Sequence, residues 1–345
     1  MKIKLPFIDQ IKERFAKKER FSVGLDIGTS SVKIAKLKIA KDSIELCGFE
    51  VVPVQVDLTP VLKKLAENYG FTRVNSSISG PAVLIRYVNF PKMKPDELAQ
   101  ALKFEAQKHI PFSVNEVNLD AYILKDDLPD NKMNVLVAAV KKEFLSQRLK
   151  VLEDAGLRIN LVDVDSLALI NTFNFNYGDD PALKNKTVAL LNIGTALSSV
   201  NILEDGIPRL TRDVHIAGNH FTQNIADGLG LEFKAAEELK HAPNKAQVQK
   251  TAQALELVLS NLGREIRISF DYYESQGAST VGKIFLSGAG SKLEGLKDAL
   301  GVLLGIEVDY WDPLRKIIIA DTLDAEKLKL DSGKLAVAVG LALRS

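Results

Sequence analysis

The residues best suited to chemistry lie in one short stretch, GLDIGTSSVK, at positions 24–33. It contains a strand-ending carboxylate, a turn glycine, two hydroxyls and a lysine on the outgoing strand: Asp26, Gly28, Thr29, Ser30 and Lys33. Such a carboxylate can hold a hydrated magnesium ion, and the glycine lets backbone N–H groups approach phosphate oxygens. The stretch therefore predicts a phosphate-binding hairpin. A plain hairpin turn is the alternative, because short glycine motifs often match by chance.

An internal repeat favours the phosphate-binding interpretation. LLNIGTALSSVNIL at 190–203 follows the same plan as GLDIGTSSVKIAKL at 24–37. Asn192 matches the first aspartate, and Gly194 and Thr195 match the glycine and threonine that follow it. Two glycine-containing hairpins, one in each half of the chain, predict a duplicated α/β fold whose hairpins clamp a polyphosphate from both sides.

Two further motifs are compatible with nucleotide binding. The stretch IFLSGAGSKLEGL at 284–296 runs from a strand through Gly288 and Gly290 into a helix, where a nucleotide can approach the flat backbone. An ordinary strand–helix connection is an equally good interpretation. Glu237 and Lys240 lie three residues apart on a predicted helix and can bind ribose hydroxyls. A solvated ion pair is the better interpretation of that spacing alone.

The elements that position these motifs form two predicted lobes, 21–186 and 187–345. Residues 81–158 read as a compact β-α-β-β-α insert in the first lobe. Residues 219–279 are mostly helical in pattern, with interruptions expected at Gly228 and Gly230, and 335–345 contain a final apolar helix that we expect to pack back on the core.

The composition of the chain argues against several classes of protein. The chain has 345 residues, of which 46% are hydrophobic, with 45 Lys and Arg against 44 Asp and Glu and a net charge of +1. A nucleic-acid-binding protein normally carries a basic excess, and a disordered chain lacks this much apolar material. The single cysteine, Cys47, excludes an internal disulfide and a cysteine-based zinc site. No stretch resembles a signal peptide or a membrane span, so we expect a cytoplasmic protein.

Although the net charge of the whole chain is close to zero, residues 1–20 form a basic segment. It has three acidic residues and seven basic ones, namely Lys2, Lys4, Lys12, Arg14, Lys17, Lys18 and Arg20. Its apolar residues Phe7, Ile8, Ile11 and Phe15 have helical spacing, which predicts an amphipathic helix able to touch acidic lipid or a partner. A frayed, solvated terminus is the better interpretation of this segment.

The order of the two hairpins and the SGAG turn resembles the actin-like ATPase superfamily, which includes actin, DnaK-type chaperones and FtsA. More specifically, the chain resembles the PilM family, the cytoplasmic actin-like proteins of type IV pilus assembly. The specific signals are ALKFEAQKHIPFSVNEVNLDAYIL at 101–124, VDVDSLALIN at 162–171 and LAVAVGLALRS at 335–345. The resemblance covers nearly all of residues 21–345.

This resemblance implies an ATP or ADP site with Mg²⁺ held by Asp26 through water. It also implies that Asp165 orients the attacking water, although a helix cap is an equal alternative because Ser166 starts a predicted helix. The remaining roles that it implies are phosphate contacts at Gly28, Thr29, Ser30, Lys33, Gly194 and Thr195, a helix start at Gly218, ribose contacts at Glu237 and Lys240, and adenosine contacts at Gly288, Gly290 and Ser291.

The second hairpin departs from the superfamily pattern because Asn192 stands where active members usually have aspartate. An amide can still bind a water of the magnesium shell, but it brings no charge and cannot accept a proton. Since phosphoryl transfer depends mostly on positioning and electrostatics, we expect nucleotide binding with slow or absent hydrolysis.

For partners, the resemblance implies the cytoplasmic N-terminal segment of a PilN-like inner-membrane protein, bound in a groove beside the insert. A small sheet with a helix offers an edge and a groove for such a peptide. Pilus motor ATPases and self-association are further expected contacts, whereas nucleic acid is not. The protein would then lie on the cytoplasmic face of the inner membrane, mainly through its partner.

Three other functions share this fold. An FtsA-like filament protein normally ends in a linker and an amphipathic membrane helix, which we do not find after the core helix. A small-molecule kinase needs longer inserts and a catalytic carboxylate. The cytoplasmic domain of a type II secretion protein continues into a membrane span.

Overall fold

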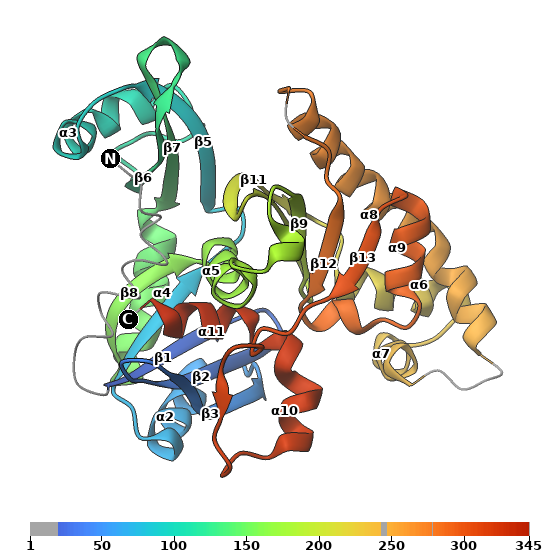
Figure 1. Cartoon of the computed structure of the whole chain (residues 1–345). Helices are drawn as coiled ribbons and strands as arrows, with labels where there is room; N and C mark the ends of the chain where they lie inside the picture. Colours follow the sequence, from blue (N-terminus) through green and yellow to red (C-terminus); the bar gives the residue numbers. More distant parts are fainter. Residues whose placement is uncertain (1–19, 243–246, 278, 345) are drawn as a thin grey trace.

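The structure is a computed structural model, which describes residues 20–242, 247–277 and 279–344 (Figure 1). The predicted amphipathic helix with Phe7, Ile8, Ile11 and Phe15 lies outside the described residues. In the described part of the chain, no helix is both long and apolar enough to span a membrane.

The first lobe is built on a six-stranded sheet with the strand order β14-β3-β2-β1-β4-β8. Strands β1, β2 and β3 are antiparallel, and β4 and β8 continue the sheet in parallel from β1. The strands are β1 (Arg20–Ile27), β2 (Ser31–Ile39), β3 (Ile44–Pro53), β4 (Arg73–Ile78), β8 (Arg158–Val164) and β14 (Ile318–Ile319).

The second lobe repeats this topology in a sheet with the order β11-β10-β9-β12-β13. Three antiparallel strands again precede two parallel ones, which confirms the predicted duplicated fold. The strands are β9 (Thr187–Ile193), β10 (Ser198–Glu204), β11 (Ile207–Val214), β12 (Lys283–Ser287) and β13 (Glu307–Tyr310). The sequence analysis did not predict β11, which follows a tight hairpin turn where Asp205 and Gly206 both have positive φ.

A third sheet, with the order β5-β7-β6, stands at the upper left of Figure 1. Its strands are β5 (Val83–Pro91), β6 (Val117–Leu128) and β7 (Lys132–Lys141), and a 3₁₀ turn, η1 (Pro129–Asn131), joins the last two. Helix α3 (Pro95–Ala106) buries Leu98 and Leu102 against Phe90 and Met133, so this part of the insert has a core of its own.

The last helix of the predicted insert belongs to a different core. Helix α4 (Lys142–Asp154) buries Leu152 together with Leu62 and Leu65 of α2 (Leu58–Tyr69) and with strand residues of β1 and β2. The predicted β-α-β-β-α unit therefore divides, because its first four elements enclose one core and α4 completes the core of the six-stranded sheet.

The helices of the second lobe cover one face of its sheet. They are α6 (Gly218–Leu229), α7 (Phe233–His241), α8 (Val248–Glu274) and α9 (Leu296–Leu304). Helix α8 buries a stripe at helical spacing, for example Leu255, Leu262 and Phe270. Gly228 lies inside α6 and does not interrupt it. A Cβ at this position would lie 2.7 Å from the Cβ of Ala254, so the glycine allows α6 to approach α8 closely.

A pair of helices, α5 (Asp165–Tyr177) and α11 (Ala336–Leu343), lies between the two large sheets (Figure 1). Every residue of α11 is buried. Two glycines permit its close packing. A Cβ at Gly24 of β1 would lie 1.9 Å from the carbonyl oxygen of Ala338, and a Cβ at Gly340 would lie 1.8 Å from that of Ala168.

The remaining short elements include one helix that was not predicted, α10 (Ala325–Asp331), which lies beside the first sheet with its Leu328 buried there. The 3₁₀ turns are η2 (Pro181–Leu183), η3 (Ala289–Lys292) and η4 (Ser332–Lys334).

We predict that Gly340→Ala destabilises the protein by about 2 kcal/mol or more, because the new methyl group has to push α11 away from α5. This loss outweighs the gain of about 1 kcal/mol that alanine normally brings to a helix. Thermal unfolding measures the change. Gly333→Ala is the matched control, since a Cβ there meets open space. Equal melting temperatures for the two variants would refute this packing.

Candidate functional site

The two repeated hairpins meet across the cleft between the lobes. Each has the same turn, closed by a backbone bond from Gly28 N to Ser31 O or from Gly194 N to Leu197 O, both 3.0 Å long. The hydroxyls of Ser30 and Thr195 are 2.6 Å apart, so one turn touches the other. A cavity of about 110 Å³ lies between the hairpins. We call this cavity and its walls the clamp.

The first hairpin brings a buried ion pair to the clamp. Asp26 and Lys33 are directly opposite on β1 and β2, and the lysine Nζ lies 3.0 Å from a carboxylate oxygen. The same Nζ lies 2.7 Å from where a Cβ on Gly28 would be, so the ammonium sits over the turn backbone. Thr29 and Ser30 also line the cavity. A phosphate here would meet an ammonium, hydroxyls and exposed turn amides together.

The SGAG turn packs against the second hairpin. Asn192 accepts a hydrogen bond of 3.1 Å from Ser287 through its Oδ1. Gly288 has φ 90°, and a Cβ there would lie 2.4 Å from the Ile193 carbonyl. Gly288 lines the clamp, as do Asn192, Gly194 and Thr195. Only glycine allows the turn to pass this close.

Two residues of this turn that were expected near adenosine have supporting positions in the structure. A Cβ at Gly290 would lie 2.8 Å from the Gly194 carbonyl oxygen, and Ser291 is buried and donates a 2.7 Å hydrogen bond to the carbonyl of Gly288. Both hold the turn in place and lie outside the cavity's lining.

The predicted ribose residues form a separate cluster behind the second hairpin. Lys240 is buried, and its Nζ lies 2.6 Å from Glu237 Oε2 and 2.8 Å from Thr222 Oγ1. It also donates to the carbonyl of Gly218 at 3.3 Å, and the Gly218 N–H in turn donates to Gly194. The lysine of this pair is therefore buried, whereas the Glu237 side chain is still 40% exposed. The pair is anchored to the clamp through Gly218, but it does not line the cavity.

Hydrogen bonds explain why the Glu237 carboxylate of this cluster is ionised. Burial raises the pKa of Glu237, but the hydrogen bonds from Lys240 and Thr222 act in the opposite direction and outweigh it, so its pKa is lowered overall. The glutamate stays ionised and keeps Lys240 in place.

Asp165 lies at the start of α5 and lines the clamp. Val164 is the N-cap residue of α5 and makes no side-chain capping bond, so Asp165 is the first helical residue rather than the cap. Burial and the negative charge of Asp26 raise the pKa of Asp165 to about 6, against the opposing effects of hydroxyls at Ser77 and Ser79. A carboxyl group with this pKa can exchange a proton near neutral pH.

Three charged residues near the clamp were missed by the sequence analysis. Arg148 of α4 donates to the Ile27 carbonyl at 3.4 Å; burial lowers its pKa, while the carboxylates of Asp165 and Asp26 act to raise it. Asp213 of β11 and Lys334 of η4 line the cavity. The register places Asp213 opposite Ser199, which is itself opposite Asn192. Only prediction of β11 would have revealed this alignment.

The clamp has a donor set that fits a nucleotide-bound magnesium ion. Mg²⁺ commonly takes one or two carboxylates together with substrate phosphates and waters. Asp26 provides such a carboxylate beside the two glycine turns, and the amide of Asn192 could hold a water of the metal's shell. When bound, the ion would neutralise phosphate charge.

A second candidate site is a groove of about 410 Å³ between the third sheet and the first lobe. Its walls come from β6 and β7 on one side and from β8 and α5 on the other. Strand β6 is an edge strand. Asn171 of α5 is buried in this groove, and neither its Oδ1 nor its Nδ2 has a hydrogen-bond partner among the described residues. A buried amide normally finds partners, so Asn171 is an exception among the described residues.

Two lobes of matching topology that meet at paired glycine hairpins define the actin-like ATPase fold. The model of the family "Type IV pilus assembly protein PilM" matches residues 24–345, so the chain belongs to that family. This result confirms the resemblance found in the sequence.

Comparison with solved structures agrees with this assignment. The "PilM-PilN type IV pilus biogenesis complex" matches 94% of this chain and 98% of its own, with 27% identity and a TM-score of 0.83. The ethanolamine utilization protein EutJ from Carboxydothermus hydrogenoformans matches 99% of this chain and 100% of its own, at 12% identity and a TM-score of 0.57. The second likeness concerns the fold alone.

Curated relatives match only in part. The cell division protein FtsA of Staphylococcus epidermidis is 28% identical over 110 residues, which are 32% of this chain and 22% of FtsA. The chaperone protein dnaK of Gracilaria tenuistipitata var. liui is 24% identical over 284 residues, which are 72% of this chain and 44% of dnaK. The chain thus spans less than half the length of these relatives.

We predict that Asp165→Asn stabilises the protein near neutral pH. The carboxyl pKa is about 6 in the folded state and about 4 in the unfolded state, so ionisation favours unfolding as the pH rises through 6. The variant lacks this effect. It should be about 1–2 kcal/mol more stable than the wild type at pH 7.5 and no more stable at pH 4. Urea unfolding at several pH values measures the difference, and a difference that does not depend on pH would contradict the prediction.

Proposed function

We propose that this chain is an ATP-binding assembly protein of the type IV pilus machine. It binds the cytoplasmic N-terminal segment of a PilN-like inner-membrane protein and hydrolyses ATP slowly or not at all. The family match and the likeness to the PilM–PilN complex support the pilus role and the partner. The unpartnered amide of Asn171 in the groove is the observation that carries the proposal for this chain.

Nucleotide binding is supported by the convergence of two hairpins, an ion pair and a glycine turn in one cleft. The cavity of about 110 Å³ is smaller than the roughly 300 Å³ at which ligand pockets begin, and the Ser30–Thr195 contact closes it. A nucleotide therefore enters by separating the two hairpins, and its phosphates replace that contact with hydrogen bonds to both turns.

Slow hydrolysis follows from the charges around the clamp. Asn192 brings no negative charge and cannot accept a proton. Besides Asp26, the carboxylates in the described lining of the clamp are those of Asp165 and Asp213, and either can still orient a water molecule. Losing one anion near the metal weakens catalysis more than it weakens binding.

The groove suits an extended peptide. Asn171 has both a donor and an acceptor to offer, which matches the alternating C=O and N–H groups of a peptide backbone. The neighbouring edge strand β6 presents main-chain groups to the same space. A segment bound here would hold the protein at the cytoplasmic face of the inner membrane. Contacts with pilus motor ATPases and self-association belong to the same proposal.

The partner half of this proposal predicts that Asn171→Leu weakens binding of the PilN-like N-terminal peptide at least tenfold, because leucine removes both hydrogen bonds at a buried position. Fluorescence anisotropy with a labelled synthetic peptide measures the affinity. Asn224→Ala on α6 is the control and should bind as the wild type does. If the wild type fails to bind at high micromolar concentration with ATP present, the partner proposal is wrong.

The nucleotide half predicts that Lys33→Gln reduces ATP affinity at least tenfold, because the ammonium above the first turn is lost. Isothermal titration with Mg²⁺ present measures it. Lys63→Gln on α2 is the matched control. Unchanged ATP affinity in Lys33→Gln would show that phosphates do not bind at the first hairpin.

A further inference from the structure

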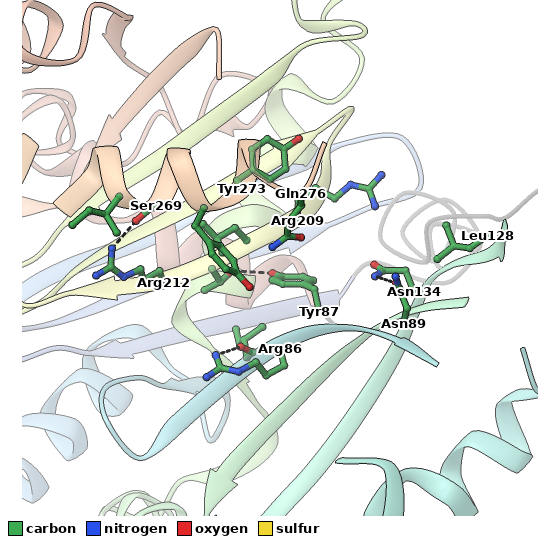
Figure 2. A pocket seen from close by; sticks show the side chains of 15 residues that line it. Arg86, Tyr87, Asn89, Leu128, Asn134, Arg209, Arg212, Ser269, Tyr273 and Gln276 are labelled. Carbon is green, nitrogen blue, oxygen red and sulfur yellow. Dashed lines mark hydrogen bonds between the residues drawn. The ribbon is translucent and has the colours of Figure 1, made fainter. Parts of the chain in front are cut away.

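A third cavity, of about 800 Å³, opens between the third sheet and the second lobe (Figure 2). One wall is β5, and the other is β11 together with the C-terminal half of α8. None of its described lining residues also lines the clamp or the groove. Strands β5 and β11 are both edge strands. Its volume is within the range of about 300–1,000 Å³ that ligand sites occupy.

The described lining of the cavity has three arginines and no carboxylate, although two of the arginines are paired with glutamates that lie outside the lining. Arg212 is held by Glu265 at 2.7 Å, and Arg209 uses its Nε to bind Glu204 at 2.8 Å. Arg86 is exposed, and its described hydrogen bond goes to the backbone carbonyl of its neighbour. The guanidinium of Arg86 and the terminal nitrogens of Arg209 can therefore receive a carboxylate.

Two buried polar atoms in the lining have no hydrogen-bond partner among the described residues. One is the hydroxyl of Tyr273, whose side chain is almost wholly buried, and the other is Oδ1 of Asn134, which donates through its Nδ2 to Asn89. The Asn134 oxygen needs a donor, whereas the tyrosine can also serve an acceptor. A peptide backbone supplies both kinds of group. A fully deprotonated inorganic anion such as sulfate supplies only acceptors and leaves the Asn134 oxygen unpaired.

The α8 wall adds an apolar surface. Ile268 and Tyr272 lie four residues apart on one face of the helix and are 47% and 59% exposed. Both residues line the cavity, so together they offer a small exposed apolar surface on which an apolar side chain of a ligand can pack. The two walls touch through Tyr87, which donates to Thr211 at 2.8 Å because the Thr211 hydroxyl itself donates to Asn201.

We propose that this cavity binds an extended acidic segment of a partner protein. A carboxylate of the segment pairs with Arg86 and Arg209. An apolar side chain packs on Ile268 and Tyr272, and the segment's backbone satisfies Tyr273 and Asn134. The site is separate from the groove, so two segments can be held at once on the same face of the third sheet, one toward its β5 edge and one toward its β6 edge.

A subtractive peptide selection tests this site. A phage library of random twelve-residue peptides is first depleted on the double variant Arg86→Gln/Arg209→Gln and then selected on the wild-type chain. The leading peptide is synthesised, and its affinity is measured by anisotropy for wild type, Arg86→Gln, Tyr272→Ala and Tyr273→Phe. Leu257→Ala, an exposed apolar position on the same helix, is the matched control. Circular dichroism and thermal unfolding check that each variant is folded.

The proposal expects enriched peptides that combine acidic and apolar residues. Binding should weaken at least tenfold in Arg86→Gln and Tyr272→Ala and severalfold in Tyr273→Phe, which loses only the unpaired hydroxyl. Leu257→Ala should bind normally, and a saturating amount of the groove peptide should not compete. The proposal is overturned if no peptide is enriched, if enriched peptides lack acidic residues, if Tyr272→Ala binds normally, or if millimolar inorganic phosphate displaces the peptide completely.

Discussion

The two lobes depend on a single shared layer, the buried helix α11. One side of α11 packs Ala338 and Val339 into the core of the first sheet. The other side packs Val337 and Leu341, together with α5, into the core beneath β9 and β12. Both lobes are therefore fixed to the same eight-residue helix, and the close contacts allowed by Gly24 and Gly340 leave it little room to shift. Motion between the lobes has to occur around this layer.

The position of α5 beside that layer connects the candidate sites. Its first residue, Asp165, lines the clamp, and Asn171, less than two helical turns later, lies in the groove. A small cavity of about 170 Å³ lies between two of these sites. Its lining includes Asp213, which also lines the clamp, and Arg86, which also lines the 800 Å³ cavity between β5 and β11. Opening of the clamp would thus displace residues that contact both the groove and the cavity between β5 and β11. This contiguity gives a physical route by which nucleotide and partner binding can influence each other.

The sequence predicted best those features of the fold that depend on residues close together in the chain. The matched glycine hairpins predicted the duplicated topology, because turn residues and strand periodicity act over a few positions. Residues that reach the clamp through tertiary packing could not be found this way. Arg148 arrives on a helix assigned to the insert, and Asp213 lies on the unpredicted strand β11. Lys240 reads as a surface residue by its spacing, yet packing of α7 on α6 buries it. The positions of these three residues depend on tertiary packing and on strand pairing, which local sequence patterns do not reveal.

We propose that the paired hairpins hold a nucleotide without turning it over quickly. The most direct test loads the purified chain with ATP and Mg²⁺, removes free nucleotide, and follows bound ATP, bound ADP and released phosphate with time. We predict about one nucleotide per chain, retained mainly as ATP long after loading. Failure to retain nucleotide, or rapid release of phosphate over many turnovers, would contradict the account.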